Sequence, residues 1–151
     1  FELALALLES SAPADRLDIL SPAMATLDHL AMYSKIDIAL DPFPYHGTTT
    51  TIEALLMGVP VVTLAGDRHA SRVGASILNA IGMPELVADS VAAYVDAARD
   101  LAADRRRLSS LRASLRSTLL SSALCDAPAH THRLEHAIRH AWRQYCTTTA
   151  P

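Results

Sequence analysis

Residues 36–66 constrain the fold of this chain more than any other segment, because they predict a strand, a turn, a helix and a second strand with almost no gap. The short apolar run 36–40 is typical of a parallel strand that is buried on both faces. Gly58 and Pro60 end the helix, and a strand over Val61–Leu64 follows. This order indicates an α/β fold with a parallel sheet and right-handed crossovers.

The rest of the chain continues the alternation of strands and helices. Apolar residues at a helical period, bounded by glycine, proline or capping residues, mark each helix. The sequence predicts a strand over 16–20, helices over 25–34, 69–81 and 90–103, a helix from 104 with apolar residues to 119, a strand or extended segment over 83–87, a loop over 121–128 and a last helix over 129–145.

The turn between the first strand and its helix contains Gly47 and four consecutive threonines, Thr48 to Thr51. A helix start leaves backbone N–H groups unpaired, and the positive end of the helix dipole attracts anions. Threonine hydroxyls add donors without adding charge, and ligands of open α/β sheets bind at the carboxyl ends of the strands. The turn is therefore a candidate phosphate site, although a plain threonine cap, which needs no ligand, fits the same residues.

Composition argues against several other classes of function. The net charge of -3, the pI near 6.1 and an aromatic content of 5% leave neither a basic surface nor many stacking rings for nucleic acid. No apolar run approaches the roughly 18 residues of a membrane span, and no signal peptide is visible. Cys125 and Cys146 lack the spacing of a zinc site. We expect a cytoplasmic protein with free thiols, no metal, no cofactor and no membrane or nucleic-acid partner.

Three blocks of sequence resemble a known family. Residues 22–29, then DIALDPFPYHGTTTTIEAL, then GVPVVTLAGDRHASRVGASIL are similar to the C-terminal catalytic half of the O-GlcNAc transferases, glycosyltransferase family 41. The resemblance covers roughly residues 20–146 without a large gap. It implies a GT-B fold, in which two Rossmann-like lobes with doubly wound parallel sheets face each other across a cleft. Residues 1–151 are then a C-terminal donor-binding lobe, incomplete at its N-terminus, with 128–146 as the closing helix.

The resemblance also assigns residues to the donor, UDP-GlcNAc. It implies that Thr49 and Thr50 contact the phosphates, that Glu53 contacts the ribose and that His29 packs on the uracil base. Each residue has a simpler interpretation beside this one. The threonines could form only a cap, Glu53 could only stabilise the helix dipole, and His29 could be an ordinary surface histidine.

Four further residues belong to the expected site. Gly47 and Thr48 complete the turn, although Thr48 stands where the family usually has histidine. Met24 lies where the main chain would meet the edge of the uracil. Tyr45, in a loop that it shares with His46 and that we expect to face the cleft, would lie near the N-acetyl group of the donor. A loop aromatic that packs on its own lobe is the alternative for Tyr45.

The resemblance implies an inverting, metal-independent transfer of GlcNAc from UDP-GlcNAc to Ser or Thr of proteins, in which helix N–H groups and threonine donors offset the charge of the leaving group. The catalytic residues are expected upstream, so this part alone would bind the donor without catalysis. The expected partners are a protein acceptor, the N-terminal catalytic lobe and TPR repeats of the same polypeptide. A nucleotide-binding or interaction module without transfer, and a different GT-B UDP-sugar enzyme, are the alternatives.

Overall fold

The computed structural model describes residue 16, residue 18 and residues 25–149. Met24 and most of the strand expected over 16–20 lie outside the described residues. In chain order the elements are α2 (Thr26–Met32), the 3-10 helix η2 (Tyr33–Lys35), β1 (Ala39–Leu40), α3 (Thr49–Leu56), β2 (Val61–Leu64), η3 (His69–Ser71), α4 (Val73–Ala80), η4 (Pro84–Leu86), β3 (Val87–Ala88), α5 (Val91–Ala103), α6 (Arg105–Leu120) and α7 (Ala127–Thr149).

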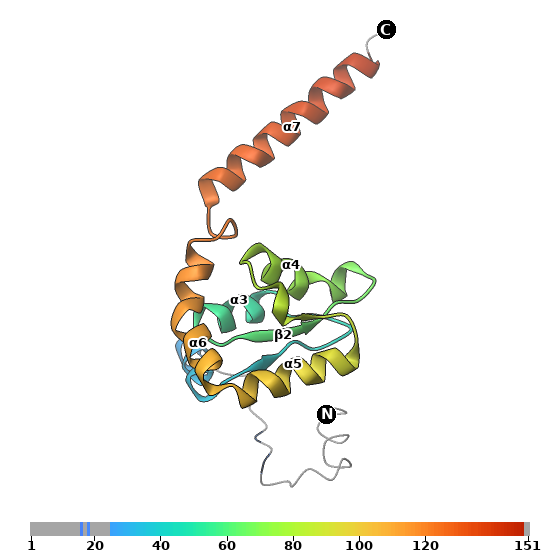
Figure 1. Cartoon of the computed structure of the whole chain (residues 1–151). Helices are drawn as coiled ribbons and strands as arrows, with labels where there is room; N and C mark the ends of the chain where they lie inside the picture. The colour runs from blue at the N-terminus through green and yellow to red at the C-terminus, as the bar shows by residue number, and fades with distance from the viewer. Residues whose placement is uncertain (1–15, 17, 19–24, 150–151) are drawn as a thin grey trace.

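The described strands form a parallel sheet in the order β1, β2, β3. Leu40 lies opposite Val62 in the first pair, and Thr63 lies opposite Val87 in the second. Because both crossovers run in one direction, their helices α3 and α4 cover the same face of the sheet. Figure 1 shows α3 and α4 on one side of β2 and α5 on the other. The predicted α/β fold with a parallel sheet is confirmed.

The helix α3 ends where the sequence predicts. Gly58 has a φ of 77° and donates its N–H to Leu55 O at 3.1 Å, while the N–H of Val59 donates to Ala54 O at 2.8 Å. This pair of hydrogen bonds is a Schellman motif, and its left-handed residue favours glycine. The motif turns the chain directly from α3 into β2, which keeps the start of α3 close to the end of β1.

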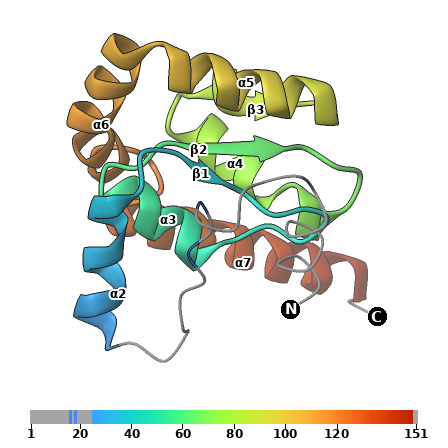
Figure 2. The ribbon, with the colours of Figure 1, turned by 90° about the horizontal axis from the view of Figure 1, so that it is seen from below.

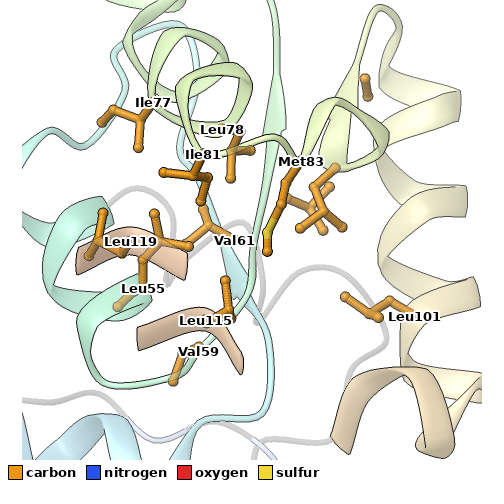
Figure 3. Close-up of a cluster of buried hydrophobic side chains, with 14 of the residues drawn as sticks. Leu55, Val59, Val61, Ile77, Leu78, Ile81, Met83, Leu101, Leu115 and Leu119 are labelled. Atoms are coloured by element: carbon orange, nitrogen blue, oxygen red, sulfur yellow. The ribbon is translucent and has the colours of Figure 1, made fainter. Parts of the chain in front are cut away.

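The core lies between the sheet and the helices that cover it. Leu55, Leu78, Leu115 and Leu119 are at most 1% exposed. Figure 3 shows Leu55, Leu78 and Leu119 converging on Val61 of β2. Burying a leucine fully stabilises a fold by about 1.5–3 kcal/mol relative to leaving it exposed. This packing fixes α3, and therefore the turn before it, relative to the sheet.

Some expected elements are shorter than predicted or are split. The strand expected over 36–40 is reduced to Ala39–Leu40. The carbonyls of Ile36 and Asp37, before it, accept hydrogen bonds from Nη1 of Arg112 at 2.6 and 3.2 Å. The helix expected over 69–81 breaks at Arg72 into η3 and α4. The helix expected over 25–34 tightens into η2 after residue 32, and 83–87 begins with the 3-10 helix η4.

The last helix, α7, starts earlier and ends later than predicted. The Asp126 carboxylate accepts the N–H of Ala129 at 3.0 Å, and Pro128 suits a first turn, where its missing N–H is not needed. Figure 1 shows α7 extending away from the rest of the molecule. Its apolar stripe is exposed, as a group of three large side chains shows: Leu134 at 52%, Ile138 at 60% and Trp142 at 64%. Among the helices in the described part, none has the length and apolarity that crossing a membrane requires.

Candidate functional site

The threonine turn, residues 47–51, lies between β1 and α3. Thr48, Thr49 and Thr50 are exposed, and Thr48 makes no side-chain cap to the helix. Thr51 is buried instead, and its hydroxyl donates to Gly47 O at 3.0 Å. The N–H groups of the first turn of α3 have no acceptor within the helix. Three of the four threonines are therefore exposed at the start of α3, and one fastens the turn.

Gly47 packs closely against the threonines that follow it. A Cβ at this position would lie 2.5 Å from Thr50 Oγ1 and 2.9 Å from Thr51 Oγ1. Its N–H donates to Oδ1 of Asp41 at 2.9 Å. The predicted site residue Gly47 thus shapes the turn, while its N–H is already used by a carboxylate of the protein.

His29 and Glu53, predicted separately, are brought together by α2 and α3. Their side chains meet with His29 Nε2 3.1 Å from Glu53 Oε2, and they are 44% and 24% exposed. Figure 2 shows α2 beside α3. The Glu53 carboxylate therefore fixes the orientation of the imidazole ring. Predictions that His29 packs on a base and that Glu53 binds a ribose remain predictions.

Tyr33 belongs to this group of side chains and was missed in the sequence. Its ring meets the ring of His29 edge to face at 5.5 Å between centroids, and its hydroxyl donates to Thr50 O at 3.2 Å. Burial, and then the negative charge of Glu53, raise the pKa of the Tyr33 phenol. The signal was the spacing: Tyr33 follows His29 by four residues, which places both on one helix face. Tyr33 links α2 to the threonine turn.

The loop between β1 and the threonine turn is only partly as expected. Tyr45 is 77% exposed, within a segment that leads directly to the turn. His46, which we expected to face the cleft with Tyr45, is 2% exposed and points into the protein. This expectation is wrong because Nε2 of His46 donates to Leu64 O at 3.0 Å, and Nδ1 accepts the N–H of Gly74 at 3.1 Å. Met24 lies outside the described residues.

Two cavities border α3 and the threonine turn. One of about 610 Å³ is lined by Thr48 and Ile52, by Arg72 and Ser76 near the start of α4, and by Cys125 in the segment before α7. The other, of about 130 Å³, is lined by a set that includes Tyr33, Asp41, Thr50 and Ala54. The exposed threonines thus lie beside two hollows of the surface, and the larger one has the volume of a small-molecule site.

The structure also bears on cysteines and metal ligands. Cys125 and Cys146 are free thiols, as predicted, and both are exposed. Within residues 25–149, histidine, cysteine and carboxylate side chains form no group of three that could hold a metal ion.

Comparisons with known proteins give a consistent family. The family model for glycosyl transferase family 41 matches residues 4–134. The chain is 50% identical over 136 residues to a rice protein named probable UDP-N-acetylglucosamine–peptide N-acetylglucosaminyltransferase SPINDLY, covering 90% of this chain and 15% of the rice protein. The Arabidopsis thaliana protein of the same name is 46% identical over the same coverage. The chain thus spans about 15% of the length of these plant relatives.

A solved structure of a mutant O-GlcNAc transferase from Thermobaculum terrenum matches the fold with a TM-score of 0.90 and 44% identity. The match covers 99% of this chain and 28% of that protein. Together with the parallel sheet described above, it confirms the predicted Rossmann-like lobe of a GT-B fold.

Proposed function

Because the chain belongs to glycosyl transferase family 41, we propose that it is the donor-binding lobe of a protein O-GlcNAc transferase. The reaction is the inverting, metal-independent transfer of GlcNAc from UDP-GlcNAc to Ser or Thr of a protein acceptor. The observation that supports it best is the threonine turn, where exposed threonines lie at the N-terminus of α3 beside the His29 and Glu53 pair. The free thiols of Cys125 and Cys146 suit the cytoplasm.

The donor is arranged along the start of α3 in this proposal. Thr49 and Thr50, with Thr48 beside them, hold the two phosphates through hydroxyls and backbone N–H groups. Glu53, one turn further along α3, accepts hydrogen bonds from the ribose, and the ring of His29 packs on the base. This order follows the order of the groups in a nucleoside diphosphate.

The charge of the leaving group explains how the lobe assists transfer without a metal. Breaking the bond to the sugar leaves negative charge on the diphosphate. The positive end of the α3 dipole and the threonine donors lie where that charge develops, and they are in place before the reaction begins. These groups bind and stabilise, and the residues that act on the acceptor are expected on another lobe.

The rest of the same polypeptide is the first partner that we propose. The exposed stripe of α7 holds Leu134, Ile138 and Trp142, and exposed apolar patches of this kind mark interaction surfaces. An N-terminal catalytic lobe packed against this stripe would complete the cleft. TPR repeats would select the acceptor.

Calorimetric titration of the chain with UDP and UDP-GlcNAc tests donor binding, with EDTA and Mg²⁺ as paired conditions. We expect saturable binding that is the same in both conditions. GDP is the matched control, because it differs from UDP only in its base. The main chain that we expect to recognise the base lies near Met24, outside the described residues. Absence of binding by UDP and UDP-GlcNAc would contradict the proposal, and tighter binding of GDP would overturn the assignment of uracil.

A transfer assay on the full-length protein separates the enzyme from the alternatives. We expect GlcNAc to appear on Ser or Thr of acceptor peptides. Donor binding without transfer by the full-length protein would favour a nucleotide-binding module. Transfer of a different sugar would indicate another GT-B enzyme.

A further inference from the structure

The hydrogen bonds of His46 define its protonation state. Leu64 O only accepts, so Nε2 carries a proton, and the N–H of Gly74 only donates, so Nδ1 carries a lone pair. The bonded ring is therefore the neutral Nε2–H tautomer. The side chain of His46 is fully buried. It connects β2 to the first turn of α4 and uses both of its nitrogens to do so.

Asp41 is buried beside this ring and is held by donors from two other places. Oδ2 accepts the hydroxyl of Thr63 at 2.7 Å, and Oδ1 accepts the N–H of Gly47 at 2.9 Å. The carboxylate is 1% exposed. Since Nδ1 of His46 carries no proton, its 3.3 Å approach to Oδ2 is a contact and not a charged pair. The buried charge of Asp41 is thus stabilised by two donors, the hydroxyl of Thr63 and the N–H of Gly47.

Gly74 packs closely against two of these residues. A Cβ on Gly74 would overlap Asp41 Oδ2 and would lie 2.5 Å from Thr63 Oγ1. The described residues contain no buried side-chain polar atom that lacks a hydrogen-bond partner. Because a buried polar network has discrete arrangements, a change at one member displaces the others.

We propose that Asp41, His46 and Thr63 are positioning residues for the donor site. They hold the segment before the threonine turn against β2 and α4, and so fix where the N–H groups and hydroxyls of Thr48–Thr50 lie. The inference rests on the proposed function of that turn. None of the three side chains reaches solvent, so they act through the turn and not on the donor.

Two substitutions of Thr63 isolate the hydroxyl. Thr63→Val keeps the shape and removes the donor, whereas Thr63→Ser keeps the donor and removes a methyl group. Tyr94→Phe is the matched control, because the Tyr94 hydroxyl donates to the backbone O of Asp41 at 3.0 Å, in the same buried region but away from the carboxylate. Melting curves of all variants show how much stability each change removes.

The readout is the ratio of UDP to uridine affinity, measured by calorimetry. We expect Thr63→Val to lower this ratio about tenfold, because a displaced turn holds the phosphates less well and the loss is that of about one hydrogen bond to a charged group. Thr63→Ser and Tyr94→Phe should keep the ratio of the wild type. An unchanged ratio in Thr63→Val, or an equal fall in Tyr94→Phe, would overturn the proposal.

Wild-type measurements test the inference without a variant and without a ligand. Amide hydrogen exchange followed by NMR should show protection at Gly47, although it precedes the helix, and the imidazole ¹⁵N spectrum should show the Nε2–H tautomer of His46. Rapid exchange at Gly47, or the other tautomer, would overturn the network. If wild type binds neither UDP nor UDP-GlcNAc, the proposed function fails, and these two measurements still decide whether the turn is held as described.

Discussion

The segment 41–46 and the threonine turn are consecutive in the chain, yet they use their polar groups in opposite ways. Asp41 and His46 point inwards, and their polar atoms are bonded to β2, α4 and Gly47. Thr49 and Thr50 are exposed. The inward groups hold the backbone in place, and this leaves the outward groups available to a ligand. Buried polar residues therefore define the site as much as exposed ones do.

The largest expected effect is a loss of stability when an inward-facing group is removed, compared with an outward-facing one. Asp41→Ala removes the acceptor of Gly47 N–H and of the Thr63 hydroxyl, and a buried group without a partner costs about 1–3 kcal/mol. We expect the free energy of unfolding in urea to fall by about 3 kcal/mol. Thr49→Ala, the outward control, should change it by less than about 0.5 kcal/mol. Equal losses in both variants would abolish the distinction between inward and outward groups.

The next largest effect is a loss of UDP affinity when outward-facing groups of the threonine turn are removed. The double change Thr49→Val and Thr50→Val keeps β-branching but removes two hydroxyl donors, so UDP binding should weaken by about 1–3 kcal/mol. Uridine binding and the melting temperature should stay near those of the wild type. Thr131→Val is the control, because Thr131 is an exposed threonine of α7 that bonds only to Ala127 O.

Two other outcomes of this experiment would change the conclusion. UDP affinity equal to wild type would end the transferase interpretation of the turn. Equal losses for UDP and uridine with a lower melting temperature would make the threonines a helix cap.

How far the sequence predicts this arrangement depends on the type of pattern. Gly58, with its glycine-proline spacing, predicts the end of α3, and helical periodicity predicts the buried face of α6. The orientation of a loop residue has no such period, so nothing in the sequence placed His46 inside. Asp41 and Thr63 were within reach, because Asp41 directly follows β1 and Thr63 lies within the neighbouring parallel strand β2. The register that pairs Leu40 with Val62 makes them neighbours.

Within the site, the sequence predicted the members but not their contacts. His29 and Glu53 were assigned to different parts of a donor, and their 3.1 Å contact depends on how α2 packs beside α3. That packing is tertiary and leaves no local signal. Tyr33 could have been found from its spacing to His29, whereas its bond to Thr50 O could not.

A smaller effect concerns Glu53, which faces outwards but has a partner. Glu53→Gln should weaken UDP binding by about 1.5 kcal/mol and pyrophosphate binding much less, because the carboxylate is directed at the ribose in our proposal. His29→Ala is the companion variant, since it removes the partner of Glu53 and leaves the carboxylate. Equal losses for UDP and pyrophosphate in Glu53→Gln would make Glu53 a helix-stabilising acid without a ligand role.

The smallest effect concerns Tyr94, an inward group. Burial, and then the charge of Asp41, raise the pKa of the Tyr94 phenol above its ordinary value of 10.0. The folded state keeps this proton where the unfolded state loses it, so the stability it contributes is present below pH 10 and is lost as pH rises further. Above pH 10, the free energy of unfolding of Tyr94→Phe should fall less steeply with rising pH than that of the wild type. Identical profiles for both proteins, measured in urea, would show that folding does not raise the pKa of Tyr94.

The isolated position of α7 has a consequence for how strongly two lobes must hold together. A segment of 121–126 ties this helix to the body. If, as we propose, a partner lobe belongs to the same polypeptide, tethering would hold it at an effective concentration of about the millimolar range. An interface at Leu134, Ile138 and Trp142 can then be weak by the standards of separate chains and still remain closed most of the time. In the proposed transferase, such an interface would also be able to open and close repeatedly, which would let a donor enter and a product leave.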